Sequence, residues 1–213
     1  MKFCVIGLGR FGRQVIRTLA ENGADVIGID SSEKNINAIR DYVAQAMCTE
    51  INDLASLEAV GIEEMHVVIL GIGEDFAKSI LIAAMIKKHY PNCKLIARAT
   101  GQIQQEIFSL LGVDQVVRPE QEAAIELADA LSSPFTNLLR MNKEFSIGLI
   151  AAPDAFIGKS LEEINLYDDF KVNCVAISRH DEYISVNNNY VVLEDDKLVL
   201  SGKNENLKKI LHL

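Results

Sequence analysis

The sequence lacks the motifs that organise zinc-binding and disulfide-rich domains. Its four cysteines are spread along the chain, with no Cys-x-x-Cys pair and no His/Cys cluster. This spacing argues against a zinc site and against a disulfide framework. Three of the cysteines lie in apolar, strand-like runs, which predicts buried and reduced thiols.

Long hydrophobic runs and a leader segment are also missing. The longest apolar stretches, such as 67–70 and 80–86, are far shorter than the roughly 20 residues that a membrane span requires. The first strand-like run begins directly after Met1, which predicts that there is no secretory signal. We therefore expect a cytoplasmic protein that reaches a membrane only through a partner.

Positive charge is scarce. The 213 residues carry a formal charge of −9, and such a surface repels phosphate backbones, so we expect no nucleic-acid partner. Hydrophobic residues make up 49% and charged residues 24% of the chain, which predicts a globular protein. The length suits one large domain, or a medium domain followed by a small one.

The clearest functional motif lies in residues 1–12. An apolar run leads into Gly7-x-Gly9-x-x-Gly12, and an amphipathic segment begins at Phe11. In this pattern Gly7 allows a sharp turn, Gly9 lets the backbone approach a phosphate, and Gly12 lets a helix pack close to a strand. The free N–H groups at the start of that helix favour an anion.

Asp30 supplies the second half of a nucleotide-binding pattern. It follows the strand-like run 24–29 and lies eighteen residues after Gly12. An acidic residue at this point binds the hydroxyls of a ribose, and it opposes a 2′-phosphate, which disfavours NADP. Asp30 does not separate NAD from ATP or ADP, because all three present the same ribose diol.

The order of elements predicts an α/β fold, a Rossmann-like, doubly wound parallel sheet with a smaller C-terminal α+β domain. Strand-like and helical segments alternate up to Pro119, including a helix from Ser31 to about Val43. Helices are then expected at 120–131 and 135–141. Beyond them lie strands at 145–151, 172–178, 183–186 and 197–201, with helices near 161–164 and 205–211. We expect a nucleotide-binding domain over 1–134, a connecting segment over 135–142 and a C-terminal domain over 143–213.

The residues that follow the strands suit binding better than catalysis. Ligands of open parallel sheets lie across the carboxyl ends of the strands, where Arg10 and Arg98 could fork onto phosphate oxygens. His66 lies at the amino end of its strand, and no His-Asp dyad occupies a strand end. We expect a binding module and no enzyme; the alternative is a small NAD-dependent oxidoreductase.

The segments 5–12 and 116–120 resemble those of a known family. Val5-Ile6-Gly7-Leu8-Gly9-Arg10-Phe11-Gly12 is similar to the signature loop of RCK domains (regulator of conductance of potassium), in the TrkA family. Val116-Val117-Arg118-Pro119-Glu120 is similar to the segment that closes the Rossmann half in these domains. The tail resembles their C-terminal module, RCK_C, so the resemblance covers nearly the whole chain.

The resemblance implies the regulatory subunit of a Ktr/Trk-type potassium uptake system. Such a subunit lies at the inner face of the membrane, forms dimers that assemble into an octameric ring, and gates a membrane potassium-translocating subunit. A nucleotide-sensing subunit of another transporter is the alternative within this class. The ligand of the potassium uptake subunit would be ATP or ADP, with NAD or NADH as the alternative. The resemblance also implies a divalent cation, Mg²⁺ or Ca²⁺, at Glu120 between neighbouring dimers.

Individual residues carry these expectations. Arg10 would reach the terminal phosphates of ATP, and Arg98 would do likewise. The further binding residues are Gly7, Gly9, Phe11, Gly12, Asp30, Ser31, Ser32, Glu50, Ile51, Ile72, Gly73, Glu74, Ala99 and Thr100. Two features depart from the family: Glu50 places a longer acid near the adenine, and the acidic stretch 165–169 disfavours cyclic di-AMP as a ligand of the C-terminal domain.

Overall fold

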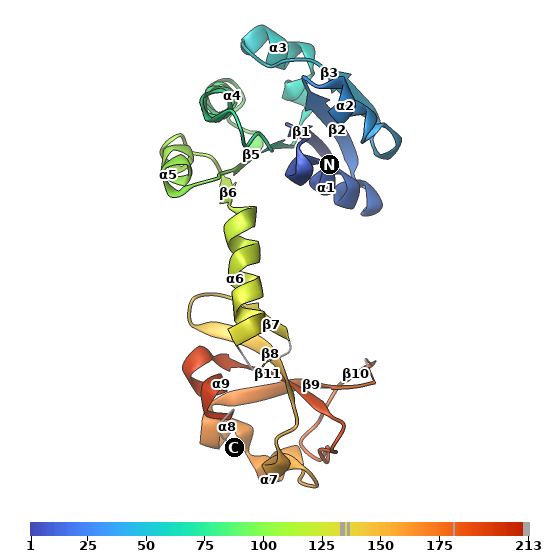
Figure 1. Cartoon of the computed structure of the whole chain (residues 1–213), viewed down its shortest axis with the longest axis vertical. Helices are drawn as coiled ribbons and strands as arrows, with labels where there is room; N and C mark the ends of the chain where they lie inside the picture. The colour runs from blue at the N-terminus through green and yellow to red at the C-terminus, as the bar shows by residue number, and fades with distance from the viewer. Residues whose placement is uncertain (133–134, 136, 181, 211–213) are drawn as a thin grey trace. The chain divides into compact units, whose positions relative to one another are not determined.

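The computed structural model describes residues 1–132, 135, 137–180 and 182–210. The chain divides into two compact units, Met1–Glu122 and Ala123–Leu213 (Figure 1). Residues 133 and 134, where we expect the first domain to end, lie outside the described part. Within the described part, no helix combines the length and the apolar character that crossing a membrane requires.

The first unit is built on a six-stranded parallel sheet, as predicted. Its strand order is β3-β2-β1-β4-β5-β6, so the order reverses between β1 and β4. A reversal of this kind opens a crevice at the carboxyl ends of the strands. The strands are β1 (Lys2–Ile6), β2 (Asp25–Asp30), β3 (Gln45–Cys48), β4 (Val67–Leu70), β5 (Lys94–Arg98) and β6 (Gln115–Val117).

Helices connect these strands, and the sheet is buried on both faces. Cys4 and Ile6 of β1 belong to one apolar cluster, and Val5 between them belongs to another. Successive side chains of a strand point to opposite faces, so an unbroken apolar run buries both. The helices are α1 (Arg10–Glu21), α2 (Glu33–Asn37), α3 (Leu54–Ala59), α4 (Phe76–His89), α5 (Gln102–Leu110) and α6 (Pro119–Ser132).

Two expectations for the first unit need correction. The helix expected to reach Val43 ends at Asn37, and a short 3₁₀ turn follows at Arg40–Tyr42. Val43 is already extended, with ψ of 150°, because the chain must enter β3 two residues later. Of the cysteines, Cys4 and Cys93 are buried, whereas Cys48 at the end of β3 is exposed.

The second unit contains a five-stranded antiparallel sheet of order β10-β9-β11-β8-β7. Leu198 and Leu200 of β11 are fully buried in its core, together with Val172 and Ile177 of β9. The strands are β7 (Asn137–Arg140), β8 (Phe145–Ala151), β9 (Val172–Arg179), β10 (Glu182–Ile184) and β11 (Lys197–Lys203). The helices are α7 (Leu161–Ile164), α8 (Leu166–Phe170) and α9 (Asn204–Ile210). Residue 211, the expected end of the last helix, lies outside the described part.

The helix expected at 135–141 is wrong. Asn137–Arg140 forms β7, which pairs with β8 so that Leu138 lies opposite Gly148. Phe135 is buried beside the same glycine, where a Cβ on Gly148 would lie 2.5 Å from the Phe135 ring. The helix α8 was not expected. It is a five-residue helix between Asn165 and Lys171, both in the left-handed region with φ of 49° and 57°.

Candidate functional site

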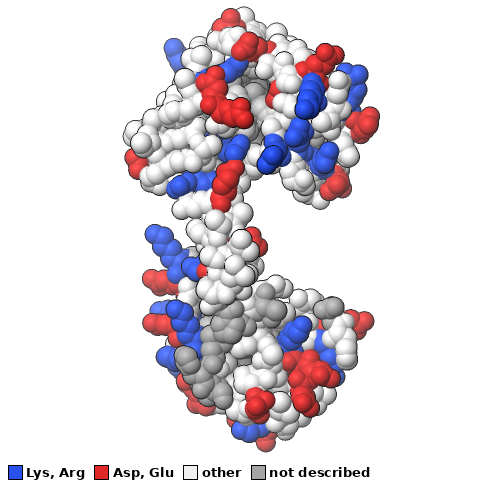
Figure 2. Space-filling view, in the orientation of Figure 1, with Lys and Arg blue, Asp and Glu red and all other residues white. Residues whose placement is uncertain are grey.

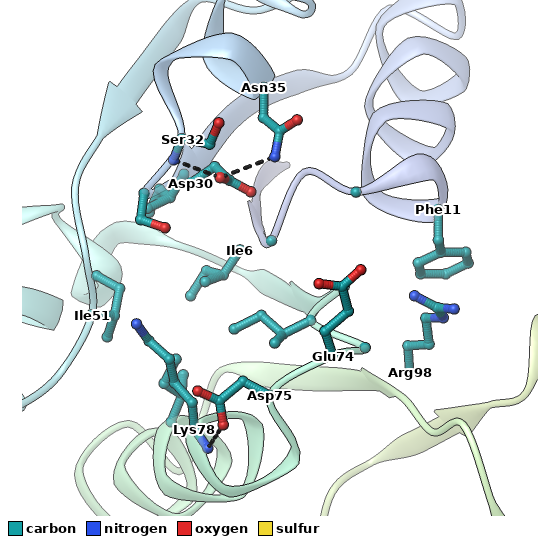
Figure 3. Close-up of a pocket in the computed structure, with 18 of the residues that line it drawn as sticks. Ile6, Phe11, Asp30, Ser32, Asn35, Ile51, Glu74, Asp75, Lys78 and Arg98 are labelled. Carbon is teal, nitrogen blue, oxygen red and sulfur yellow. Dashed lines mark hydrogen bonds between the residues drawn. The ribbon is translucent and has the colours of Figure 1, made fainter.

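A cavity of about 900 Å³ opens at the carboxyl ends of the parallel strands (Figure 3). Its lining brings together most of the residues expected from the sequence, namely Gly7, Gly9, Arg10, Phe11, Asp30, Ser31, Ser32, Glu50, Ile51, Ile72, Gly73, Glu74, Arg98, Thr100 and Glu120. Gly12 and Ala99 do not line the cavity, and both are buried.

The glycines of the β1–α1 loop act differently from one another. Gly7 has a positive φ of 91°, a backbone conformation in which any residue with a side chain would be strained. A Cβ on Gly12 would lie 2.1 Å from the Gly7 oxygen, so helix packing requires glycine there. Gly9 has ordinary extended backbone, and no described heavy atom beyond its chain neighbours lies within 4 Å of where its Cβ would be. The protein's own packing therefore does not require glycine at position 9, and the open space beside it can admit a ligand.

The start of α1 offers donors to that space. Gly9 is the N-cap, and no described side chain caps the helix. The first N–H groups of a helix have no partner within the helix, and the positive end of its dipole favours an anion. The loop therefore has the chemistry of a phosphate site.

Asp30 lies on the β2 side of the cavity and joins two loops (Figure 3). Its Oδ2 accepts a hydrogen bond from Leu8 N at 2.6 Å, and its Oδ1 accepts from Ser32 N at 2.8 Å and from Asn35 Nδ2 at 3.1 Å. A carboxylate has about four lone-pair sites, so Asp30 can still accept from ligand hydroxyls. Asn35 was not among the expected residues, although it follows Asp30 closely enough to be sought as a partner of that acid.

Arg98 and Asp30 lie at opposite ends of the cavity, with Glu74 between them (Figure 3). The Arg98 guanidinium lies 5.9 Å from the centroid of the Phe11 ring and donates to Glu120. A Cβ on Gly73 would come within 2.5 Å of Arg98 Nη1, so glycine lets the guanidinium lie against the backbone. Arg98 Nε is buried with no hydrogen-bond partner in the described structure.

Electrostatics around Glu120 favour its charged form. Its own backbone N–H lowers the pKa of the carboxyl, burial raises it, and the hydrogen bond from Arg98 lowers it again; the pKa lies below its usual value. Among the described residues, no group of three or more His, Cys, Asp or Glu could hold a metal ion. A cation at Glu120 would need ligands from outside this set, and it stays a prediction.

Lys78 is the main lining residue that sequence reasoning missed. It lies in the first turn of α4, and its ammonium pairs with Glu50, which follows β3. The hydrogen bond from Lys78 lowers the pKa of Glu50. Asp75 also lines the cavity and caps α4 by accepting from Lys78 N at 2.9 Å. The cap could have been found from the sequence, as Asp75 precedes a helical run.

His66 has a structural contact, away from the cavity. Its Nδ1 accepts a hydrogen bond from Lys2 N at 3.1 Å, at the amino end of the sheet.

Side chains of both signs lie on the visible face of each unit (Figure 2), so the excess of acid does not make that face uniformly negative.

The parallel sheet, the glycine loop and an acid after the second strand define a Rossmann-like nucleotide-binding domain, here followed by a smaller antiparallel α+β domain. The TrkA-N domain family matches residues 3–119, and the TrkA-C domain family matches residues 149–213. The chain therefore belongs to the TrkA family of RCK regulatory domains, which is not a family of enzymes.

Known relatives extend this assignment over the full length. Ktr system potassium uptake protein C of Bacillus subtilis (strain 168) is 28% identical, over 99% of this chain and 98% of its own. Ktr system potassium uptake protein A of the same organism is 29% identical, over 98% of this chain and 94% of its own. A solved structure of the Shewanella denitrificans Kef CTD in AMP bound form is 26% identical, with a TM-score of 0.54; the match covers 62% of this chain and 80% of that one.

Proposed function

We propose that this protein is the nucleotide-sensing regulatory subunit of a Ktr-type potassium uptake system, with ATP and ADP as its ligands. One observation carries the proposal: a single cavity has an acid suited to a ribose at one end and an arginine with an unpaired donor at the other. Relatives named as Ktr potassium uptake proteins, similar over the full length, support the transport role. The related Kef CTD with bound AMP supports an adenine nucleotide.

The site residues divide by the part of the ligand that they would contact. Asp30, Ser31 and Ser32 would bind the ribose, and Glu50 and Ile51 would flank the base. The glycine loop and α1 would hold the inner phosphates, and Arg10 and Arg98 would reach the terminal ones, since guanidinium groups pair well with phosphate oxygens. NAD would place its second nucleoside in the space beyond the glycine loop, which makes it the alternative ligand.

A signal requires that the two nucleotides bind differently. ATP and ADP share the adenosine, so contacts at Asp30 bind both equally and shift no conformational equilibrium. Groups that contact the γ-phosphate can supply the difference, and Arg10 and Arg98 are the candidates. A hydrogen bond to a charged group contributes about 1.5–3 kcal/mol, a population shift of roughly tenfold to a hundredfold.

The remaining parts of the proposal concern assembly. Residues 1–134 would form the sensing domain, 135–142 the connection and 143–213 the C-terminal domain. The chain would act at the cytoplasmic face of the membrane, as dimers joined in an octameric ring against the potassium-translocating subunit. A cation at Glu120 would join neighbouring dimers.

The direct test is potassium flux. The full chain is combined with a Ktr-type membrane subunit in lipid vesicles, and uptake is measured with ATP, with ADP, and without nucleotide. We expect ATP to stimulate uptake above ADP. As a control, the chain is mixed with NADH and candidate substrates, and the absorbance of NADH at 340 nm is followed. The oxidoreductase alternative predicts that this absorbance falls as NADH is consumed. Equal uptake under all three conditions would contradict the proposed function.

A further inference from the structure

Asp30 accepts hydrogen bonds from two backbone groups and from one side chain, that of Asn35. The backbone N–H of Leu8 donates to Oδ2 at 2.6 Å, and the backbone N–H of Ser32 donates to Oδ1 at 2.8 Å. Asn35 lies in helix α2, and its Nδ2 donates to the same Oδ1 at 3.1 Å (Figure 3). A substitution of Asn35 can therefore remove one of these bonds and leave the two backbone bonds in place.

Arg13 determines which end of the Asn35 amide faces Asp30. Arg13 lies in helix α1, and its Nη1 donates to Asn35 Oδ1 at 3.2 Å. A guanidinium can only donate and an ionised carboxylate can only accept, so a single orientation of the amide satisfies both neighbours. In that orientation Oδ1 faces Arg13 and Nδ2 faces Asp30. Arg13 thus keeps a donor, rather than an acceptor, directed at the acid.

The three bonds leave Asp30 with an acceptor site for a ligand. A carboxylate has about four lone-pair sites, and the two on Oδ1 accept from Ser32 and Asn35. Leu8 N fills one of the two on Oδ2, and the other remains. The terminal torsion of an aspartate is broad, so a carboxylate without fixed donors can rotate. Asp30 is held on both oxygens and lines the cavity, so it presents the remaining site in one direction.

We infer that Asn35, oriented by Arg13, is a positioning residue for ribose recognition: it holds Asp30 so that the remaining site on Oδ2 accepts from a ribose hydroxyl. The inference rests on the proposed function, because it assumes that a nucleotide places its ribose at Asp30. Asn35 acts through the acid, and Arg13 acts through Asn35. The contacts join α1, α2 and β2 around the sugar end of the cavity.

The test compares Asn35→Ala with the wild-type full chain by calorimetric titration of ATP and of 2′,3′-dideoxy-ATP. The second nucleotide lacks both ribose hydroxyls, so its affinity does not depend on how Asp30 is held. We expect the wild type to prefer ATP. We expect Asn35→Ala to weaken ATP binding about three- to tenfold, the effect of one hydrogen bond, and to leave dideoxy-ATP affinity unchanged. The matched control is Asn37→Ala, exposed on the same helix and outside the cavity lining.

Asn35→Asp separates the bond to Asp30 from the contact with Arg13. The new carboxylate can still accept from Arg13, but it offers no donor to Asp30 and places a like charge beside it. We expect the preference for ATP over dideoxy-ATP to fall at least as far as in Asn35→Ala. If Asn35→Asp kept the wild-type preference, the amide would serve only to link α1 to α2.

Arg13→Ala removes the group that orients the amide and keeps the amide itself. We expect it to lower the preference for ATP over dideoxy-ATP by less than Asn35→Ala does. Arg17→Ala, on the same helix and outside the cavity lining, should leave the preference unchanged. An equal effect of the two arginine substitutions would show that the charge of α1, and not the contact with Asn35, is responsible.

A double-mutant cycle determines whether Asn35 acts through Asp30. In the Asp30→Ala background we expect Asn35→Ala to change ATP affinity by less than about twofold, because the carboxylate that Asn35 positions is gone. An undiminished effect in that background would show that Asn35 contacts the nucleotide directly.

Each remaining outcome contradicts the inference. Tighter ATP binding by Asn35→Ala would show that the amide competes with a ribose hydroxyl for Asp30, and unchanged binding would show that it has no part in recognition. Equal weakening of ATP and dideoxy-ATP would show a general distortion of the cavity. Equal affinity of the wild type for both nucleotides would show that the ribose hydroxyls are not recognised. These results differ from failure of the proposed function, in which the wild-type chain binds no nucleotide at all.

Discussion

Asp30 accepts a hydrogen bond from the backbone N–H of Leu8 at 2.6 Å, across 22 residues of sequence. One carboxylate thereby fixes the glycine loop after β1 and lies where a ribose would bind. The order of the elements explains the coincidence: β1 and β2 are neighbours in register, so their carboxyl ends meet. In the proposed site, the shape of the glycine loop and recognition of the sugar would thus depend on the same side chain.

Substitutions of the loop glycines should separate effects on folding stability from effects on ATP binding. Gly12→Ala places a Cβ 2.1 Å from the Gly7 oxygen, and we expect it to lower the free energy of unfolding by about 1–3 kcal/mol or more. The Cβ of Gly9→Ala would meet no described heavy atom within 4 Å apart from its chain neighbours, so the unfolding temperature of this variant should match the wild type. We expect Gly9→Ala to weaken ATP binding by about tenfold or more, because the new methyl group enters the phosphate space.

Thermal unfolding and calorimetric titration check both variants. If Gly9→Ala bound ATP as the wild type does, the ligand would not approach this part of the loop.

Arg10 should distinguish ATP from ADP. It lies in the first position of α1, is exposed and lines the cavity. We expect Arg10→Ala to weaken ATP binding by about tenfold to a hundredfold, to leave ADP affinity nearly unchanged and to abolish ATP-stimulated uptake in vesicles. The matched control is Arg17→Ala, on the same helix, whose guanidinium lies over the Tyr42 ring at 5.1 Å and outside the cavity lining. Equal losses for both nucleotides would mean that Arg10 binds the diphosphate they share.

Asp196 should make stability depend on pH in the C-terminal unit. The residue is 1% exposed and accepts from Arg179 Nε at 2.8 Å, Tyr190 Oη at 2.9 Å and Leu193 N at 2.8 Å. Burial raises the pKa of Asp196, but these hydrogen bonds outweigh it and hold the pKa below its ordinary value. A carboxyl with a lowered pKa stabilises the fold above its unfolded-state pKa, and this stability is lost as the pH falls through the folded-state value.

We therefore expect the unfolding temperature to fall below about pH 4, and to fall less steeply in Asp196→Asn. At neutral pH Asp196→Asn should lose about 3 kcal/mol, because its amide group would face the Arg179 guanidinium. Asp195→Asn, exposed and adjacent, is the control. Parallel pH profiles for wild type and Asp196→Asn would show that another group sets the acid transition.

The sequence predicts the first unit well because strands buried on both faces appear as short apolar runs, as β1 does between Lys2 and the glycine loop. It fails at β7, since Leu138, Leu139 and Met141 fit either a helix or a strand. Pairing with β8, which local spacing does not contain, decides between them. Lys78 was missed for a similar reason: its contact with Glu50 spans 28 residues and depends on how α4 meets the loop after β3.

Calorimetric titration of ATP into the wild-type chain and into Asp30→Ala tests the central claim most directly. We predict saturable ATP binding by the wild type and a loss of about tenfold to a hundredfold in Asp30→Ala, equal for ATP, ADP and AMP because all three share the ribose. Asp25→Ala, at the opposite end of β2, should bind as the wild type does, and Asp30→Asn, which keeps the side-chain shape, should still lose affinity. Absence of ATP binding by the wild type, or unchanged affinity in Asp30→Ala, would contradict the account.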